Sequence, residues 1–115
     1  MEQLTEIQVL LKKVEFDVSM PQLRTLSFLV QGFLLRKNGL KLNIVEKVLH
    51  YMIYEIYEKK IRPNEIKQKA KVKIKLNIAQ AQALKSAFGY LNVEHMPYEN
   101  TLVDYITGEI HRQTI

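Results

Sequence analysis

The chain has 115 residues, of which 47% are apolar and 25% are charged, with 17 Lys plus Arg against 12 Asp plus Glu. This composition predicts a single domain over residues 1–115, whose core needs neither disulfides nor a zinc cluster. Because the sequence has no cysteine, cysteine chemistry is excluded. Neither a secretory leader nor an apolar run of membrane-spanning length is recognisable, so we expect a cytoplasmic protein that does not engage a membrane.

The chain begins with a short N-terminal element, residues 1–12. A helix is predicted over 4–11, although the apolar residues at 7, 9 and 11 also fit a strand. Strict alternation follows. The polar residues of this segment point to one side. The four apolar residues that alternate with them point to the other side and are Val14, Phe16, Val18 and Met20. A period of two is typical of a strand that is buried on one face only.

Two helices are predicted after this strand. Ser19 and Gln22 have the spacing of a capping box, and a helix from 21 to 36 is apolar on most of its circumference, which implies burial on several sides. An Asn-Gly pair at 38–39 ends it. Asn43 and Glu46 repeat the capping spacing and open a second helix, which is expected to end near Arg62-Pro63. The apolar stripe of this second helix is Val45, Val48, Leu49, Met52, Ile53 and Ile56.

A basic segment leads into a second series of elements. Residues 59–75 hold eight Lys or Arg against one Glu, a local net charge of +7, and residues 63–70 are predicted to be a linker. A second alternating strand begins at Lys71, and Asn77 with Gln80 caps a helix from 79 to about 92. A loop that contains Pro97 precedes a last helix from about 98 to 112.

The order strand, helix, helix therefore occurs twice, in residues 13–62 and 71–115. Sliding the chain by 58 residues superimposes the apolar positions of the two strands. We predict an α+β fold of two pseudo-symmetric repeats, with a two-stranded antiparallel ribbon packed on about four helices. In this register Phe16 lies opposite Ile74, and Glu15 and Asp17 lie opposite lysines 75 and 73. Pairing of each strand with another chain, as a swapped dimer, stays open.

This pattern resembles the ribbon-helix-helix family of DNA-binding proteins. The resemblance rests on four features: an alternating strand, a helix entered through Met20-Pro21-Gln22-Leu23, the Asn-Gly turn and a second capped helix. Both halves lie in one chain. It implies that outward ribbon side chains enter the major groove of double-stranded DNA, while backbone amides at 42–44 bind phosphate. With the adjacent basic segment, the nucleic-acid-binding residues are then Lys13, Asn43, Lys67, Lys69, Lys71, Lys73 and Lys75. Glu15 and Asp17 depart from a purely basic surface.

Other function classes find less support in the sequence. The three histidines lack metal-ligand spacing, and no nucleophile, acid–base pair or phosphate loop is recognisable, so we expect a non-enzymatic protein without cofactor or metal. Tyr51, Tyr54 and Tyr57 beside His50 fit the border of a core stripe, or alternatively a stacking surface or pocket rim. The alternative function is a protein-interaction or assembly module of the same fold. The apolarity of residues 23–35 also predicts a homodimer.

Overall fold

The two strands and the helices of the chain form an α+β arrangement in the computed structural model, which describes residues 12–36 and 43–115. The sequence predictions for the N-terminal element, the Asn-Gly turn and residue 42 lie outside the described residues. The elements are β1 Lys13–Ser19, α2 Met20–Leu35, α3 Ile44–Ile56, a π-helical turn η1 Tyr57–Ile61, α4 Arg62–Lys67, β2 Lys71–Asn77, α5 Ile78–Gly89 and α6 Pro97–Thr114.

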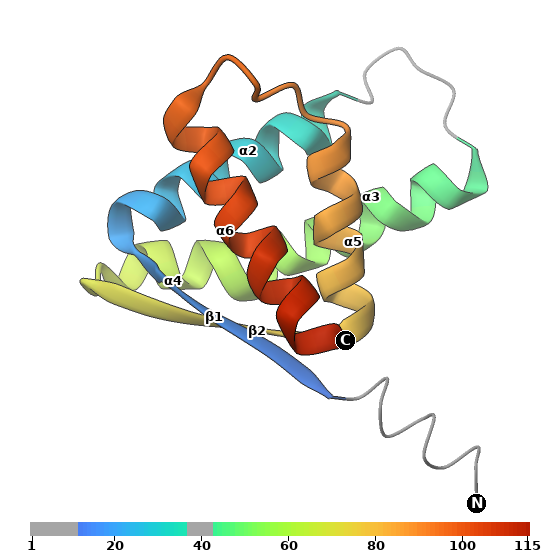
Figure 1. The fold of residues 1–115 in the computed structure, drawn as a ribbon. Helices are drawn as coiled ribbons and strands as arrows, with labels where there is room; N and C mark the ends of the chain where they lie inside the picture. Colours follow the sequence, from blue (N-terminus) through green and yellow to red (C-terminus); the bar gives the residue numbers. More distant parts are fainter. Residues whose placement is uncertain (1–11, 37–42) are drawn as a thin grey trace, which may run out of the picture.

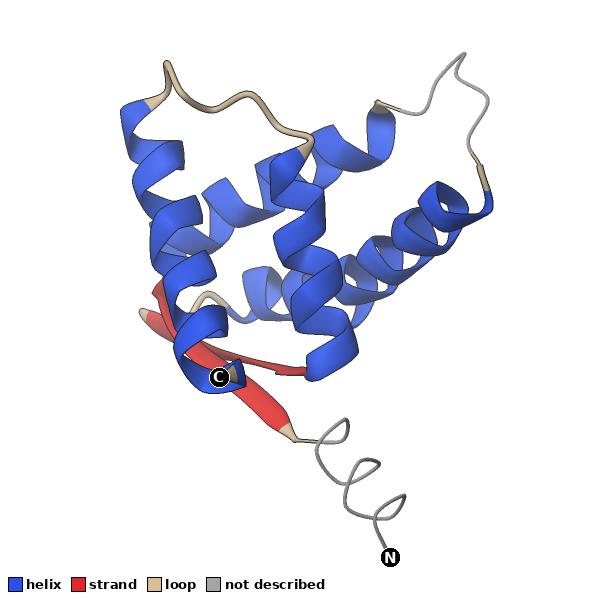
Figure 2. Ribbon diagram, turned by 45° about the vertical axis from the view of Figure 1, so that its right-hand side comes forward, coloured by secondary structure: helices blue, strands red, loops and turns tan. Residues whose placement is uncertain are grey.

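Strands β1 and β2 pair antiparallel within one chain, in the register predicted from the sequence. Phe16 lies opposite Ile74, Glu15 opposite Lys75, and Asp17 opposite Lys73. The apolar residues of both strands are buried beneath the helices, whereas the polar residues turn outward. Figure 2 shows the helices gathered on one side of the two-stranded ribbon. A two-stranded ribbon is stable here because its apolar face packs on helices.

Three helix starts confirm the capping predictions. Ser19, Asn43 and Asn77 each accept a hydrogen bond from the backbone N–H three residues later, and the Gln or Glu at that position bonds back to the cap N–H. Two of these boxes lie at the junction where a strand ends and a helix begins. Each strand is therefore joined to the following helix without a loop, which fixes the direction in which α2 and α5 leave the ribbon.

The predicted helix end at Arg62-Pro63 is wrong. Helical backbone continues from α3 through η1 into α4, so most of the predicted linker at 63–70 is helix. The reason is the π-helical turn, in which the Arg62 N–H bonds to the Tyr57 carbonyl five residues earlier. This wider turn precedes Pro63, whose ring would otherwise clash with the previous α-helical turn. The chain leaves the helix at Gln68, which adopts a left-handed φ of 51°.

The core lies between the ribbon and the helices. Its largest fully buried side chains come from both strands and from α2, α3, η1, α5 and α6: Val14, Val18, Leu23, Leu26, Ile53, Ile56, Ile61, Ile74, Leu76, Leu84, Ile106 and Ile110. The predicted burial of two residues on each of two helices is wrong. Val45 and Val48 on α3 are exposed, and so are Phe28 and Leu35 on α2. Among the described residues, no helix has the length and apolar character needed to cross a bilayer.

Candidate nucleic-acid interface

The outward side of the ribbon presents charged side chains in two parallel rows. Strand β2 contributes Lys71, Lys73 and Lys75, all exposed, and β1 contributes exposed Lys13 together with half-buried Glu15 and Asp17. We call these six residues the ribbon face. The alternation that buries the apolar residues of each strand also aims these six at solvent. The described helices lie on the opposite side of the sheet (Figure 1).

Ion pairs connect the two rows of the ribbon face. Lys71 Nζ lies 3.5 Å from the carboxylate of Asp17, and the carboxylate of Glu15 lies 3.7 Å from Lys73 Nζ and 4.0 Å from Lys75 Nζ. Two of these contacts are diagonal rather than directly across the ladder, because long lysine side chains reach neighbouring positions as well. The lysine side chains remain 52–72% exposed in these pairs. Such exposed pairs contribute about 0–1 kcal/mol each, so the ammonium groups remain available to a stronger anion.

The charge of the ribbon face is positive despite its two acids. Four lysines oppose two carboxylates there. Two further exposed lysines precede β2 in the chain, Lys67 at the end of α4 and Lys69 in the turn before the strand. A polyanion at the ribbon face would meet its four lysines together.

Asn43 is separated from these lysines. Its side chain accepts the Glu46 N–H at 2.8 Å as the cap of α3. In Figure 1 the start of α3 lies at the right, away from the two strands at the bottom of the view. The family resemblance puts Asn43 in the same DNA contact as the ribbon lysines. In the structure Asn43 caps the end of α3 opposite to η1, and η1 packs near β2.

Helix α6 covers the outer edge of β1. The Glu15 N–H donates to Gln113 Oε1 at 2.9 Å, and Gln113 Nε2 donates to the Glu15 carbonyl at 2.6 Å. The Tyr105 hydroxyl donates to the Asp17 carbonyl at 2.8 Å. These side chains occupy the position where a third strand would pair, so the ribbon stays two strands wide on this side. Sequence patterns did not indicate these contacts, which join residues 98 and 88 positions apart.

A shallow polar groove of about 250 Å³ separates the ribbon face from α6. Arg112, exposed at its rim, donates a hydrogen bond to Glu109, and this bond holds the pKa of Glu109 below its ordinary value. Partial burial opposes that shift, and a second hydrogen bond from Gln113 supports it. Arg112 thus adds a cation beside β1 that the sequence patterns did not indicate.

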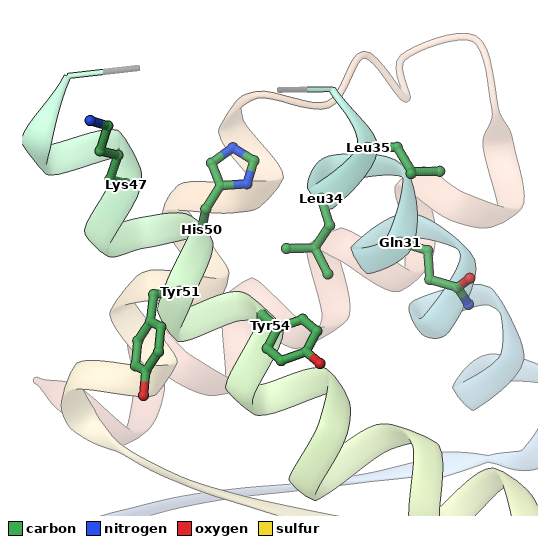
Figure 3. A pocket seen from close by; sticks show the side chains of 7 residues that line it. All are labelled: Gln31, Leu34, Leu35, Lys47, His50, Tyr51 and Tyr54. Carbon is green, nitrogen blue, oxygen red and sulfur yellow. The ribbon is translucent and has the colours of Figure 1, made fainter. Parts of the chain in front are cut away.

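A second hollow lies between α2 and α3, on another side of the molecule. It has a volume of about 580 Å³ and is lined mainly by apolar and aromatic side chains (Figure 3): Gln31, Leu34, Leu35, Lys47, His50, Tyr51 and Tyr54. The His50 ring stacks on Phe33 with centroids 4.5 Å apart. Tyr57 packs against the core, as expected for the border of a stripe, whereas Tyr51 and Tyr54 are mostly exposed and form the rim of this hollow.

Within residues 12–36 and 43–115, no group of three or more His, Asp or Glu side chains is placed to hold a metal ion. Comparisons of the chain with protein-family models, with curated proteins and with solved structures found no match.

Proposed function

We propose that this chain is a non-enzymatic protein that binds double-stranded DNA through its ribbon face. The observation that carries the proposal is the row of exposed lysines along β2, supplemented by Lys13 on β1, on a side of the sheet that the described helices leave open. A two-stranded ribbon has the width that the major groove of B-DNA admits. This is also the docking mode that the ribbon-helix-helix resemblance implies.

The charges define the kind of contact. Lysines release condensed counterions when they neutralise phosphates, which gives affinity without sequence preference. Glu15 and Asp17 lie on β1 beside the lysine row of β2, where carboxylates can accept from the cytosine amino group while their partners Lys71 and Lys73 turn to phosphates. Asn43 caps the end of α3 that lies away from the two strands, so the proposal rests on the lysines alone.

The internal repeat is part of the same proposal. Two strands with matching alternation, each followed by a capping box and two helices, support a pseudo-twofold relation between residues 13–62 and 71–115. The π-helical turn and α4 have no counterpart in the second half. Under this relation the ribbon presents one strand from each half to the DNA, and the two strands run in opposite directions.

Fluorescence anisotropy of a labelled mixed-sequence DNA duplex tests the proposal. We expect binding at about 50 mM salt that weakens by orders of magnitude at about 200 mM. Replacing Lys71 and Lys73 by Gln removes two cations without adding acids to the ribbon. This change is expected to reduce the slope of log affinity against log salt by about 2, because two phosphates are then no longer neutralised.

The matched control removes two cations elsewhere, by Arg36→Gln at the C-terminal cap of α2 with Lys85→Gln on α5. It changes net charge equally, so an unchanged salt slope is expected. If both double variants weaken binding alike, binding reflects net charge and the ribbon proposal fails. Absence of binding by the unchanged chain at the lower salt would also refute it, and would favour the protein-interaction alternative, for which the exposed apolar residues of α2 and α3 are the supporting observation.

A further inference from the structure

An unusually apolar surface covers the outer sides of α2 and α3. Six large side chains there are between 52% and 73% exposed: Phe28, Leu35, Ile44, Val48, Tyr51 and Tyr54. We call these six the α2–α3 face. On α3, Tyr51 points directly away from the side that carries the buried Ile53 and Ile56, with Ile44 two turns before it. On α2, Phe28 and Leu35 are likewise two turns apart on one side.

The extent of this surface is that of an interface. If the full areas of such side chains are about 150–220 Å² each, the six expose roughly 700 Å² together. The largest apolar patch on a typical monomer is about 300–600 Å². One side of a stable protein–protein interface buries about 800 Å². The area that these six side chains expose in sum is therefore close to what one partner contributes to a dimer.

The residues of α3 are arranged to match a second copy of themselves. We propose that two chains associate through the α2–α3 face, with their α3 helices antiparallel about a twofold axis at Tyr51. Residues equally distant from Tyr51 then meet across the axis. Lys47, four residues before it, faces the partner's Glu55, four residues after it, and Val48 faces the partner's Tyr54. In this arrangement each lysine of the pair meets an opposite charge, and each valine meets an apolar ring, on the second copy.

The local contacts are compatible with this packing. Glu55 now pairs with Lys59 at 3.2 Å in an exposed i,i+4 pair, which is weak enough to exchange for an intermolecular one. The hollow between α2 and α3 is open beside Tyr54 and can receive an aromatic side chain of the second copy. The inference does not rest on the proposed function, because the α2–α3 face and the ribbon face share no residue.

Sedimentation velocity of the full chain tests the association. Over a roughly hundredfold range of concentration we expect the mass to rise from 13.5 kDa to twice that value and to stop there. Tyr51→Glu is expected to raise the dissociation constant about thirtyfold or more, as for an interface hot spot. Tyr98→Glu on α6 is the matched control, since Tyr98 is also an exposed helical tyrosine, and it should leave the dimer unchanged.

A charge exchange tests the antiparallel geometry itself. Lys47→Glu alone and Glu55→Lys alone place like charges across the axis and should each weaken the dimer. The double variant restores opposite charges and should return the dissociation constant to within about threefold of the unchanged chain, which is the coupling expected of a direct pair. Circular dichroism checks that every variant is folded.

Three results would overturn the association through this face, and a fourth would overturn its proposed geometry. The unchanged chain could remain monomeric throughout, its mass could grow past twice the monomer, or the Tyr51 and Tyr98 variants could behave alike. A dimer that Tyr51→Glu dissociates, but that the charge exchange does not restore, would exclude the antiparallel arrangement about Tyr51.

Discussion

The side-chain amide of Gln113 holds α6 against the ribbon, and its removal has a definable cost. Gln113 accepts from the Glu15 N–H and donates to the Glu15 carbonyl, replacing both bonds of a missing neighbouring strand. Gln113→Ala removes both bonds and leaves the helical backbone intact. Gln113→Glu keeps an acceptor but loses the donor, and it places a carboxylate beside Glu109, which now accepts a hydrogen bond from Gln113 at 3.1 Å.

The expected loss in the free energy of unfolding follows from the partial burial of these two hydrogen bonds. A typical net contribution is about 0.5–1.5 kcal/mol for each hydrogen bond. Because water can reach the strand edge once the side chain is gone, we expect the lower part of that range, about 1–2 kcal/mol for Gln113→Ala in total. For a chain of this length that destabilisation lowers the melting temperature by roughly 4–8 °C. Gln113→Glu should cost at least as much, because repulsion from Glu109 adds to the missing donor.

Urea unfolding and amide hydrogen exchange measure the two consequences. The unfolding midpoint should fall, and the Glu15 amide should exchange faster in Gln113→Ala while the amide of Phe16, the next residue of β1, keeps its protection. Gln82→Ala, which truncates an exposed glutamine on α5, is the control. If the two glutamine variants unfold at the same urea concentration and Glu15 keeps its protection, the amide clamp is not a stabilising contact.

Further predictions concern the core, a helix cap and an acidic group. Ile106→Ala should destabilise the fold by about 2–5 kcal/mol in urea unfolding, because Ile106 on α6 is a fully buried member of the core. Asn77→Ala should lower the free energy of unfolding by about 1 kcal/mol in the same assay, since it removes the cap of α5. Asn77→Ser should keep most of that stability, because serine is also a good N-cap. Arg112 holds the pKa of Glu109 below 4.5, so this pair stabilises the fold above about pH 4.5 and is lost as the pH falls through the lowered value. Glu109→Gln should flatten the dependence of stability on pH in that acidic range, and an unchanged dependence would contradict the assignment.

Local signals in the sequence predicted much of the fold. Strand alternation set which residues face the core, and the register followed because a shift of one residue would have turned every apolar side chain outward. The capping boxes at Ser19, Asn43 and Asn77 are visible as spacings of three residues and need no tertiary information. The lysines of the ribbon face were predictable for the same reason, since they occupy the polar positions of an alternating strand.

The features that the sequence did not indicate depend on distant residues or on a rare backbone form. Pro63 after a charged residue is typical of a helix end, yet the π-helical turn from Tyr57 carries the helix past it. The contacts of Gln113 and Tyr105 with β1 require knowledge of where α6 lies. Exposure of Val48 was missed because an apolar stripe shows which residues share a side of a helix and not whether a neighbouring element covers it.

The lysines of the ribbon have two explanations, protection of a strand edge and contact with phosphates, and the two edges of the ribbon distinguish them. Lysine on an edge strand discourages pairing with other chains, and this could account for Lys73 and Lys75, which lie opposite Asp17 and Glu15 and so turn their backbone groups to the outer edge of β2. It is less needed at Lys13, because Gln113 and Tyr105 of α6 already cover the edge of β1 at the neighbouring Glu15 and Asp17. If the lysines only protect an edge, Lys13→Gln should leave DNA affinity unchanged at about 50 mM salt, whereas contact of the whole ribbon face with phosphates predicts weaker binding and a salt slope smaller by about 1.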